Sequence, residues 1–435
     1  MKAEEFSRRR SQLMRMVGEG GIAILPSAPI RMRSRDVEYR YRQDSDFYYL
    51  TGFAEPDAVA VLVPGRDGGE YLLFCRDRDA EKELWDGTRA GTGGAVERFA
   101  ADDAFPIDDI DDILPGIIES CTRVYYTMGM YTDFDARVSE WINSLRARES
   151  KGVHTPQEFV ALEHLLHDMR LYKSRAEVSA MRKAAKVAVR AHERAMQVVR
   201  PGMYEYEVEA EFRHEFRRRD AWVSYSPIVG AGTNSCTLHY VDNNQQLKDG
   251  DLLLIDAGCE LDYYASDVTR TIPVNGRYTA EQRAVYDIVL EAQLAAIDKT
   301  RKGNHWNEPH DAAVKIITRG LLDLGLLEGS PSELIAERAY RRFFMHRTGH
   351  WLGMDVHDVG DYKIGDQWRL LEPGMVTTVE PGIYIAPQSD VPERFHNIGI
   401  RIEDDVLVTA SEPDVLSKGL VKEPQAIESM MMANG

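Results

Sequence analysis

Residues 252–271, LLLIDAGCELDYYASDVTRT, place two acidic residues, Asp256 and Asp267, inside apolar, strand-like sequence. Four apolar residues lead directly into Asp256, and a polar stretch that could form a turn separates it from Asp267. A charge at the end of a buried strand is costly unless a partner neutralises it. Two strands folded back as a hairpin would bring both carboxylates together, where they favour a cation between them. The segment therefore predicts half of a cation site.

The length of 435 residues is more than one hydrophobic core usually serves, so we expect two domains. The net charge of −18 argues against nucleic-acid binding, which needs a basic surface. The four cysteines are scattered without a CxxC pair, which fits reduced thiols better than a zinc ribbon. No stretch approaches the roughly 20 apolar residues of a membrane span, and the charged start does not resemble a secretory signal. We expect a cytoplasmic protein that binds neither nucleic acid nor a membrane.

The hydrophobic pattern predicts a smaller α/β domain over residues 1–172. Its expected elements are a helix over 3–17 and strands near 22–25, 58–63, 71–75 and 122–127. The polar and aromatic residues 39–52 are typical of a loop running into an edge strand. The acidic residues 102–112 suggest a solvated loop and a short helix.

Residues 173–435 are expected to form a larger α+β domain. Ser174 and Glu177 form a capping-box pattern that opens a helix to about residue 199. Further helices are expected over 205–219, 279–297, 309–326 and 332–343, and strands over 224–229, 252–255, 265–273, 376–379 and 399–402. Helices precede strands twice, which suggests a duplicated α+β unit with a site at its junction.

Three further residues join the two aspartates. Glu380 repeats the design at Asp256, because an apolar strand leads into the acid and a turn follows, and Glu403 lies in alternating strand sequence. His350 lies in a Gly-rich segment. Each residue alone is usually a cap, a surface charge or an ordinary histidine, so the prediction rests on all five occurring together.

Four carboxylates and one imidazole form a hard, oxygen-rich ligand set without thiolates. This set favours Mn²⁺ or Mg²⁺, with Co²⁺ or Zn²⁺ able to substitute. One divalent ion does not need four anionic ligands, but two ions ~3.5–4 Å apart do. His239 and His357 are candidates for orienting a substrate or stabilising an oxyanion, although spacing alone fits satisfied core histidines equally well.

The chain resembles the M24 metallopeptidases, which have the pita-bread fold, and among them the aminopeptidase P branch. The resemblance lies in DAG (256–258), DVTRT (267–271), HWLG (350–353), EPG (380–382) and RIED (401–404). YRQDSDF (41–47), LTGF (50–53) and DVHDVG (355–360) also resemble this branch, so the similarity spans nearly the whole chain. The N-terminal match separates it from methionine aminopeptidases, which lack that domain.

The resemblance implies two divalent ions, usually Mn²⁺. Asp256 would bind one ion, His350 and Glu380 the other, and Asp267 and Glu403 would bridge them. A hydroxide held between the ions would attack the carbonyl before proline, and Glu380 would take up a proton and return it to the leaving nitrogen.

The resemblance also implies substrate contacts. His239 and His357 would hold the substrate and stabilise the oxyanion. His346, Tyr384 and Arg401 would shape the proline side or support the ligands, and Arg401 could hold the carboxylate of Glu403 by a charge-assisted hydrogen bond. Trp85 resembles a family position that caps the site of a neighbouring subunit in a dimer or tetramer, although an ordinary surface tryptophan fits as well. The Arg347-Thr348-Gly349 sequence departs from the bacterial pattern and affects only the expected shape of the pocket wall.

The expected function is removal of the N-terminal residue from peptides with proline in the second position. A prolidase, which cuts only Xaa-Pro dipeptides, is one alternative. The other is a non-catalytic pita-bread module that binds peptides, but relatives of that kind typically lose ligands, and all five ligands are present here.

Overall fold

The computed structural model describes residues 1–432, and the chain forms two compact units, Met1–Met169 and Arg170–Gly435. Among the described residues, no helix combines the length and apolar character that crossing a membrane requires.

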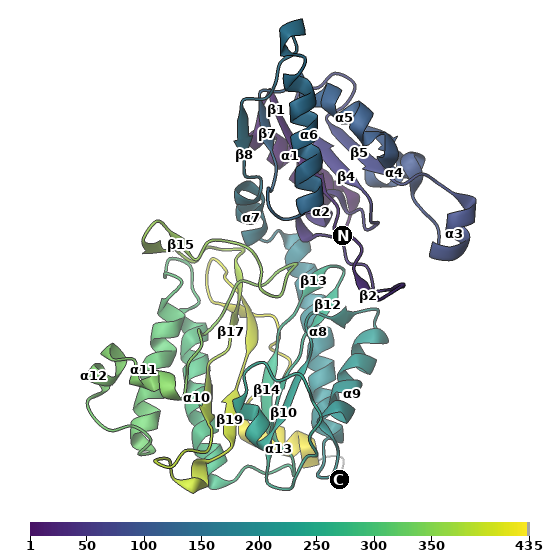
Figure 1. The fold of residues 1–435 in the computed structure, drawn as a ribbon. Helices are drawn as coiled ribbons and strands as arrows, with labels where there is room; N and C mark the ends of the chain where they lie inside the picture. Colours follow the sequence, from purple (N-terminus) through teal and green to yellow (C-terminus); the bar gives the residue numbers. More distant parts are fainter. Residues whose placement is uncertain (433–435) are drawn as a thin grey trace. The chain divides into compact units, whose positions relative to one another are not determined.

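The first unit is built on a mixed sheet with strand order β6-β5-β4-β1-β7-β8. Its strands are β1 (Gly21–Pro26), β4 (Val59–Leu62), β5 (Tyr71–Cys75), β6 (Asp103–Pro106), β7 (Arg123–Tyr125) and β8 (Glu158–Val160). Strand β1 pairs antiparallel with β4 and parallel with β7. Helices lie beside the sheet (Figure 1), whereas α3 (Ala80–Asp86) extends away from it. The others include α1 (Ala3–Val17), α4 (Gly91–Phe99), α5 (Ile110–Ile118), α6 (Thr132–Arg146) and α7 (Glu163–Leu171). The predicted α/β architecture is therefore confirmed.

Residues 39–52 do not form the expected loop and edge strand. Ser45–Thr51 forms helix α2, whose N-cap Asp44 accepts a hydrogen bond from the backbone N–H of Phe47. Gly52 ends the helix in the left-handed conformation, which glycine adopts without strain. Phe47 and Tyr49 are buried, so these aromatic side chains belong to the buried face of a helix and not to a strand. Residues 103–106 also differ from expectation, because they form β6 and pair parallel with β5.

In the second unit, strands lie between two groups of helices (Figure 1). One group is α8 (Arg175–Val198) and α9 (Glu205–Arg217), and the other is α10 (Ala280–Lys299), α11 (Glu308–Asp323) and α12 (Pro331–Ala336). The expected capping box is present, since Ser174 and Glu177 exchange hydrogen bonds. Helix α13 (Pro424–Met432) follows the last strand.

The strands at the centre of this unit form several small antiparallel sheets. Strands β10 (Ile228–Ala231), β11 (Leu252–Asp256) and β14 (Thr269–Pro273) form one sheet, and β17 (Val376–Val379), β20 (Asp404–Leu407) and β21 (Asp414–Val415) form another. Further pairings join β18 (Gly382–Ile385) to β19 (Ile398–Arg401), and β12 (Cys259–Leu261) to both β9 (Trp222–Val223) and β13 (Tyr264–Ala265). This α+β arrangement agrees with the predicted fold class.

The hairpin expected around the two aspartates is present. Strands β11 and β14 pair antiparallel with Asp256 opposite Thr269, and Asp262 and Tyr263 make the intervening turn with positive φ angles. Three other expectations need correction. Residues 224–229 are not one strand, because β9 and β10 flank a break, and residues 265–273 divide between β13 and β14. Residues 332–343 divide into α12 and the 3-10 turn Ala339–Arg342.

Candidate metal centre

Each predicted acidic ligand lies at the end of a strand or beside one. Asp256 is the last residue of β11, and Asp267 lies two residues before β14. Glu380 directly follows β17, and Glu403 lies between β19 and β20. These positions place a carboxylate where the chain leaves a sheet, so each side chain can turn toward a common centre.

His350 reaches the same centre from a segment that runs along β17. The backbone N–H of Thr378 donates to the carbonyl oxygen of His350 at 3.0 Å, and Trp351 forms an isolated bridge with Thr377. Gly349 has no room for a side chain, because a Cβ there would lie 2.1 Å from the carbonyl oxygen of Thr378. The close backbone approach therefore fixes the imidazole beside the strand that ends at Glu380.

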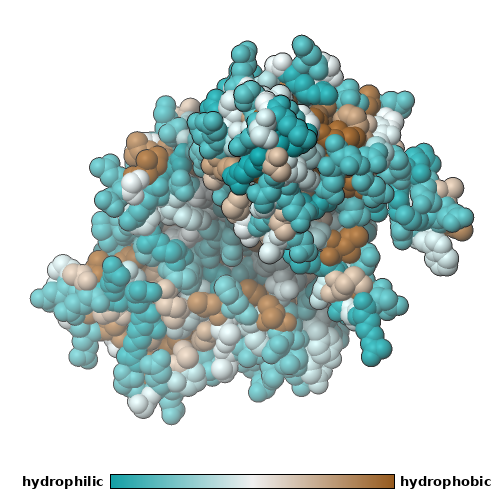
Figure 2. Space-filling view, turned by 45° about the horizontal axis from the view of Figure 1, so that its top comes forward, coloured by the Kyte–Doolittle hydropathy of each residue, from teal (hydrophilic) through white to brown (hydrophobic). Residues whose placement is uncertain are grey.

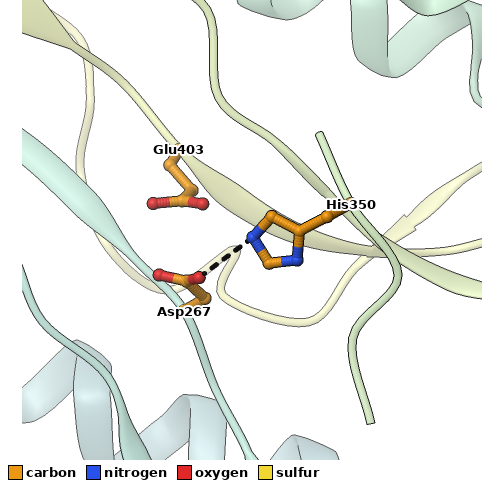
Figure 3. Close-up of side chains that lie close together, drawn as sticks. All are labelled: Asp267, His350 and Glu403. Carbon is orange, nitrogen blue, oxygen red and sulfur yellow. Dashed lines mark ion pairs between the residues drawn. The ribbon is translucent and has the colours of Figure 1, made fainter. Parts of the chain in front are cut away.

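The structure brings the five predicted ligands together. The Nε2 atom of His350 lies 3.3 Å from Oδ2 of Asp267 and 3.6 Å from Oε1 of Glu380. Ligand atoms of Asp267, His350 and Glu403 all lie within 4.8 Å of one another. Figure 3 shows the imidazole and the two carboxylates turned toward the same small space. Asp256 lines the same cavity.

The charges of this cluster are poorly balanced. Burial, together with the neighbouring carboxylates, raises the pKa of Glu380 to about 7 and that of Glu403 well above its ordinary range. Burial also raises the pKa of Asp256, although Arg401 opposes the change. Carboxyl groups in this state are short of positive charge.

His350 partly supplies the missing charge. Burial disfavours its protonated form, yet the hydrogen bond to Asp267 and the charge of Glu380 raise the pKa of His350 to about 9. Burial likewise opposes ionisation of Asp267, but the hydrogen bond and charge of His350 lower the pKa of that carboxyl. An imidazolium and the Arg401 guanidinium face four buried carboxylates, so the donor set fits divalent cations, which bind carboxylate and neutral imidazole.

Arg401 and Tyr384 extend a hydrogen-bonded chain away from the cluster. Nη2 of Arg401 donates to Oδ2 of Asp256 at 2.6 Å, and Nη1 donates to the hydroxyl of Tyr384 at 2.8 Å. That hydroxyl lies 2.8 Å from Nε2 of His346. Burial and the Arg401 charge lower the pKa of His346 to about 3, so its imidazole is neutral.

Two supporting residues, Tyr225 and Thr269, were not anticipated from the sequence. The hydroxyl of Tyr225 lies 2.5 Å from Oδ1 of both Asp256 and Asp267. Oγ1 of Thr269 donates to Oε2 of Glu403 at 2.6 Å. Thr269 stands inside the DVTRT motif, which could have drawn attention to it, but no local pattern marks Tyr225.

A cavity of about 760 Å³ opens over the cluster. Its walls include His239, His346, His357 and Arg401 in addition to the five ligands. The rings of His350 and His357 meet edge to face with centroids 4.3 Å apart. The predicted histidines are therefore placed around one cavity, whereas Trp85 lies on α3 of the first unit with 86% of its surface exposed.

Comparisons with known proteins agree with this site. The model of metallopeptidase family M24 matches residues 179–410, and the model of the aminopeptidase P N-terminal domain matches residues 6–125. The chain is 45% identical to the Xaa-Pro aminopeptidase of Escherichia coli over 99% of this chain and 98% of that protein. It is 42% identical to the Haemophilus influenzae protein of the same name, covering 98% of this chain and 97% of that one.

Solved structures show the same fold. The aminopeptidase PepP of Pseudomonas aeruginosa is 58% identical, with a TM-score of 0.99 and coverage of 100% of this chain and 99% of that chain. Zinc-substituted E. coli aminopeptidase P in complex with product is 45% identical, with a TM-score of 0.98 and the same coverage. With a family match over more than half of its length and full-length relatives well above 30% identity, the chain belongs to metallopeptidase family M24.

Proposed function

We propose that this chain is a metal-dependent aminopeptidase that releases the N-terminal residue from peptides with proline in the second position. The observation that carries the proposal is the complete five-residue ligand set, gathered under one cavity in a chain 45% identical along its length to the E. coli Xaa-Pro aminopeptidase. Within it, residues 173–435 would form the catalytic domain and residues 1–172 the accessory domain.

The ligand set would hold two divalent ions, with Mn²⁺ as the working metal and Mg²⁺, Co²⁺ or Zn²⁺ as substitutes. The proposed ligands are Asp256, Asp267, His350, Glu380 and Glu403. Divalent ions bound here would lower the pKa of water and polarise the substrate carbonyl.

The remaining chemistry belongs to the side chains. Glu380 would take up a proton and return it to the proline nitrogen as the bond breaks. His239 and His357 line the cavity and would hydrogen-bond the carbonyl oxygen as it gains negative charge. Arg401 would hold Asp256 in place, while His346 and Tyr384 support the proline side. An Xaa-Pro bond lacks an N–H, so a dedicated pocket recovers binding that ordinary peptidases lose there.

Substitution of a ligand tests this assignment. Glu380→Ala and Asp256→Ala should each lower turnover of a Xaa-Pro-Xaa tripeptide with Mn²⁺ by at least about 10²- to 10⁴-fold. This range is the usual contribution of a general base. Glu337→Ala, which removes an exposed carboxylate outside the cavity, serves as the control. Undiminished turnover in either ligand variant would sink the mechanism.

A prolidase and a non-catalytic peptide-binding module can each be distinguished from the proposed aminopeptidase, the first by its substrates and the second by metal binding. A prolidase would cut Xaa-Pro dipeptides and largely ignore Xaa-Pro-Xaa, because it must recognise the carboxylate that follows proline. A peptide-binding module would retain no divalent ion after Mn²⁺ loading and would hydrolyse neither substrate.

We further propose that the chain works in the cytoplasm as a homo-oligomer, a dimer or a tetramer, in which Trp85 covers part of a neighbouring subunit's site. The support is the exposure of Trp85 on a helix without a single buried residue.

A further inference from the structure

Arg347 and Trp368 stand together on the wall of the cavity, and the proposed mechanism uses neither. The guanidinium carbon of Arg347 lies 5.0 Å from the centroid of the Trp368 ring. Nζ of Lys363 lies 4.5 Å from the same centroid. Trp368 and Lys363 belong to the hairpin of β15 (Lys363–Ile364) and β16 (Gln367–Trp368). The indole of Trp368 therefore makes cation–π contacts with both Arg347 and Lys363.

The Arg347 guanidinium is held by neutral groups. Its Nη2 donates to Oδ1 of Asn307, and Asn307 is itself oriented by a 2.7 Å hydrogen bond to Asp311. Among the described residues, no carboxylate forms an ion pair with Arg347 or Lys363 within 4.0 Å. Burial lowers the pKa of Arg347, and the nearby charge of Asp311 only partly opposes this change. Without a directly paired carboxylate, the guanidinium can accept an anionic ligand.

The cavity is therefore polarised. Its floor carries four carboxylates, and its wall carries Arg347 with Lys363 beside it. A peptide has a free ammonium group at one end, and negative charge is available only farther along, at acidic side chains or at the C-terminal carboxylate. A peptide whose N-terminus lies at the acidic floor would present such a group to the basic wall.

We propose that Arg347, stacked on Trp368, is a specificity determinant that binds a carboxylate of the peptide on the C-terminal side of proline. A guanidinium held over an indole face has N–H donors left besides the one that Asn307 accepts. Two parallel N–H donors of a guanidinium match the two oxygens of a carboxylate. The carboxylate comes either from an acidic residue after proline or from the C-terminus of a short peptide. This inference rests on the proposed function, because it assumes that the cavity takes Xaa-Pro peptides.

The test compares four peptides on the full-length, Mn²⁺-loaded protein: Ala-Pro-Glu-amide, Ala-Pro-Gln-amide, Ala-Pro-Ala and Ala-Pro-Ala-amide. The first pair isolates a side-chain carboxylate and the second pair a terminal one. For at least one pair, kcat/KM of the carboxylate member should exceed that of the neutral member by about fivefold or more, mainly through KM. Arg347→Gln should bring that ratio to about one, because kcat/KM of the carboxylate member falls much more than kcat/KM of the neutral member.

Two controls separate charge recognition from packing. Arg347→Lys keeps the charge but loses the planar fork, so it should give an intermediate ratio. Arg319→Gln removes an exposed cation that does not line the cavity and should leave the ratio as in the parent. Equal ratios in the parent and Arg347→Gln, or an equal loss on all four peptides, would overturn the proposal.

Binding distinguishes failure of this inference from failure of the proposed function. Analogues of the same four peptides, with a methylene in place of the scissile carbonyl, are titrated calorimetrically into the loaded protein and into Arg347→Gln. A preference for the carboxylate analogue that Arg347→Gln abolishes supports the inference even if no peptide is cut. Hydrolysis without any carboxylate preference supports the function and rejects the role of Arg347.

Discussion

Tyr225 holds the two aspartates of the hairpin together through one hydroxyl. That oxygen lies 2.5 Å from Oδ1 of both Asp256 and Asp267. Burial and the adjacent carboxylates raise the pKa of Tyr225 well above its usual range, so the group remains a hydroxyl donor at any working pH. The residue orients two proposed ligands of different roles at once.

Tyr225→Phe should therefore lower the affinity for Mn²⁺ by about tenfold or more, the usual effect of removing a group that orients metal ligands. Calorimetric titration of the metal-free protein measures this. Tyr240→Phe, which removes a hydroxyl bonded to Glu205 instead, should bind Mn²⁺ as the parent does. Equal affinities for the parent and Tyr225→Phe would contradict the expectation.

His192 is a buried histidine outside the metal centre. Its Nε2 lies 3.2 Å from the carbonyl oxygen of Ala257, and its ring packs edge to face on Phe212. Burial and the charge of Arg270 lower the pKa of His192 to about 3 from its usual 6.5. Between these two values the unfolded chain binds a proton that the folded protein does not.

Stability should consequently fall as the pH decreases through that window, by about 1.4 kcal/mol per pH unit for this one group. In His192→Gln, the free energy of unfolding should fall less steeply with decreasing pH, by about 1.4 kcal/mol per pH unit, whether or not the substitution changes stability at neutral pH. Denaturant titrations between pH 4 and 6.5 measure it, and identical slopes in variant and parent would refute the role of His192.

At the scale of elements, an ion cluster fixes the segment that carries His350 and His357. The carboxylate of Asp358 is buried and accepts from Nζ of Lys173 at 2.9 Å and from Nη2 of Arg170 at 2.5 Å. Although burial opposes it, these two cations lower the pKa of Asp358. A Cβ at Gly353 would lie 2.1 Å from the same carboxylate, so the segment wraps tightly around Asp358.

Asp358→Ala should destabilise the protein by about 3–5 kcal/mol, because it leaves two cations without their buried partner. Activity should fall as well, since His357 is its neighbour in the chain. Asp355→Ala removes a partly exposed partner of the same Arg170 and should cost much less. Thermal unfolding of both variants makes the comparison, and equal losses would mean that the cluster has no special role.

Elements were predictable where local signals were strong. The capping box at Ser174 and the β11–β14 hairpin both formed as expected. Helix α2 was missed because its aromatic residues suggested a strand, while the decisive signal was the capping aspartate, Asp44, before a short buried turn. Strand β6 was missed because acidic residues surround it in the sequence, while its place in the sheet comes from parallel pairing with β5, a strand from a distant segment.

At the scale of the whole molecule, α3 bears an unusual apolar surface. Leu84 and Trp85 are 83% and 86% exposed. Neighbouring large apolar side chains that are exposed to solvent often mark an interaction site. Most of the face visible in Figure 2 is hydrophilic, and brown patches are scattered over it. Burial of these two side chains would favour association of subunits.

Trp85→Ala should shift the protein from an oligomer toward the monomer at micromolar concentration. Sedimentation velocity measures the mass distribution, and Met130→Ala, which alters another half-exposed apolar side chain, is the control. A monomeric parent would exclude the proposed oligomer, and an unchanged distribution in Trp85→Ala would exclude the role of this residue.

The sequence by itself determined the five ligand candidates and the α+β class. A carboxylate at the end of an apolar strand is costly without a partner, and both the apolar run and the acid are visible in the local sequence. Only the tertiary structure decided which groups support those ligands. Tyr225 meets Asp256 and Asp267 across segments distant in the chain. On the cavity wall, Arg347 meets Trp368 in the same way. Such contacts leave no local pattern, because nothing at one end of a long-range contact constrains its immediate neighbours.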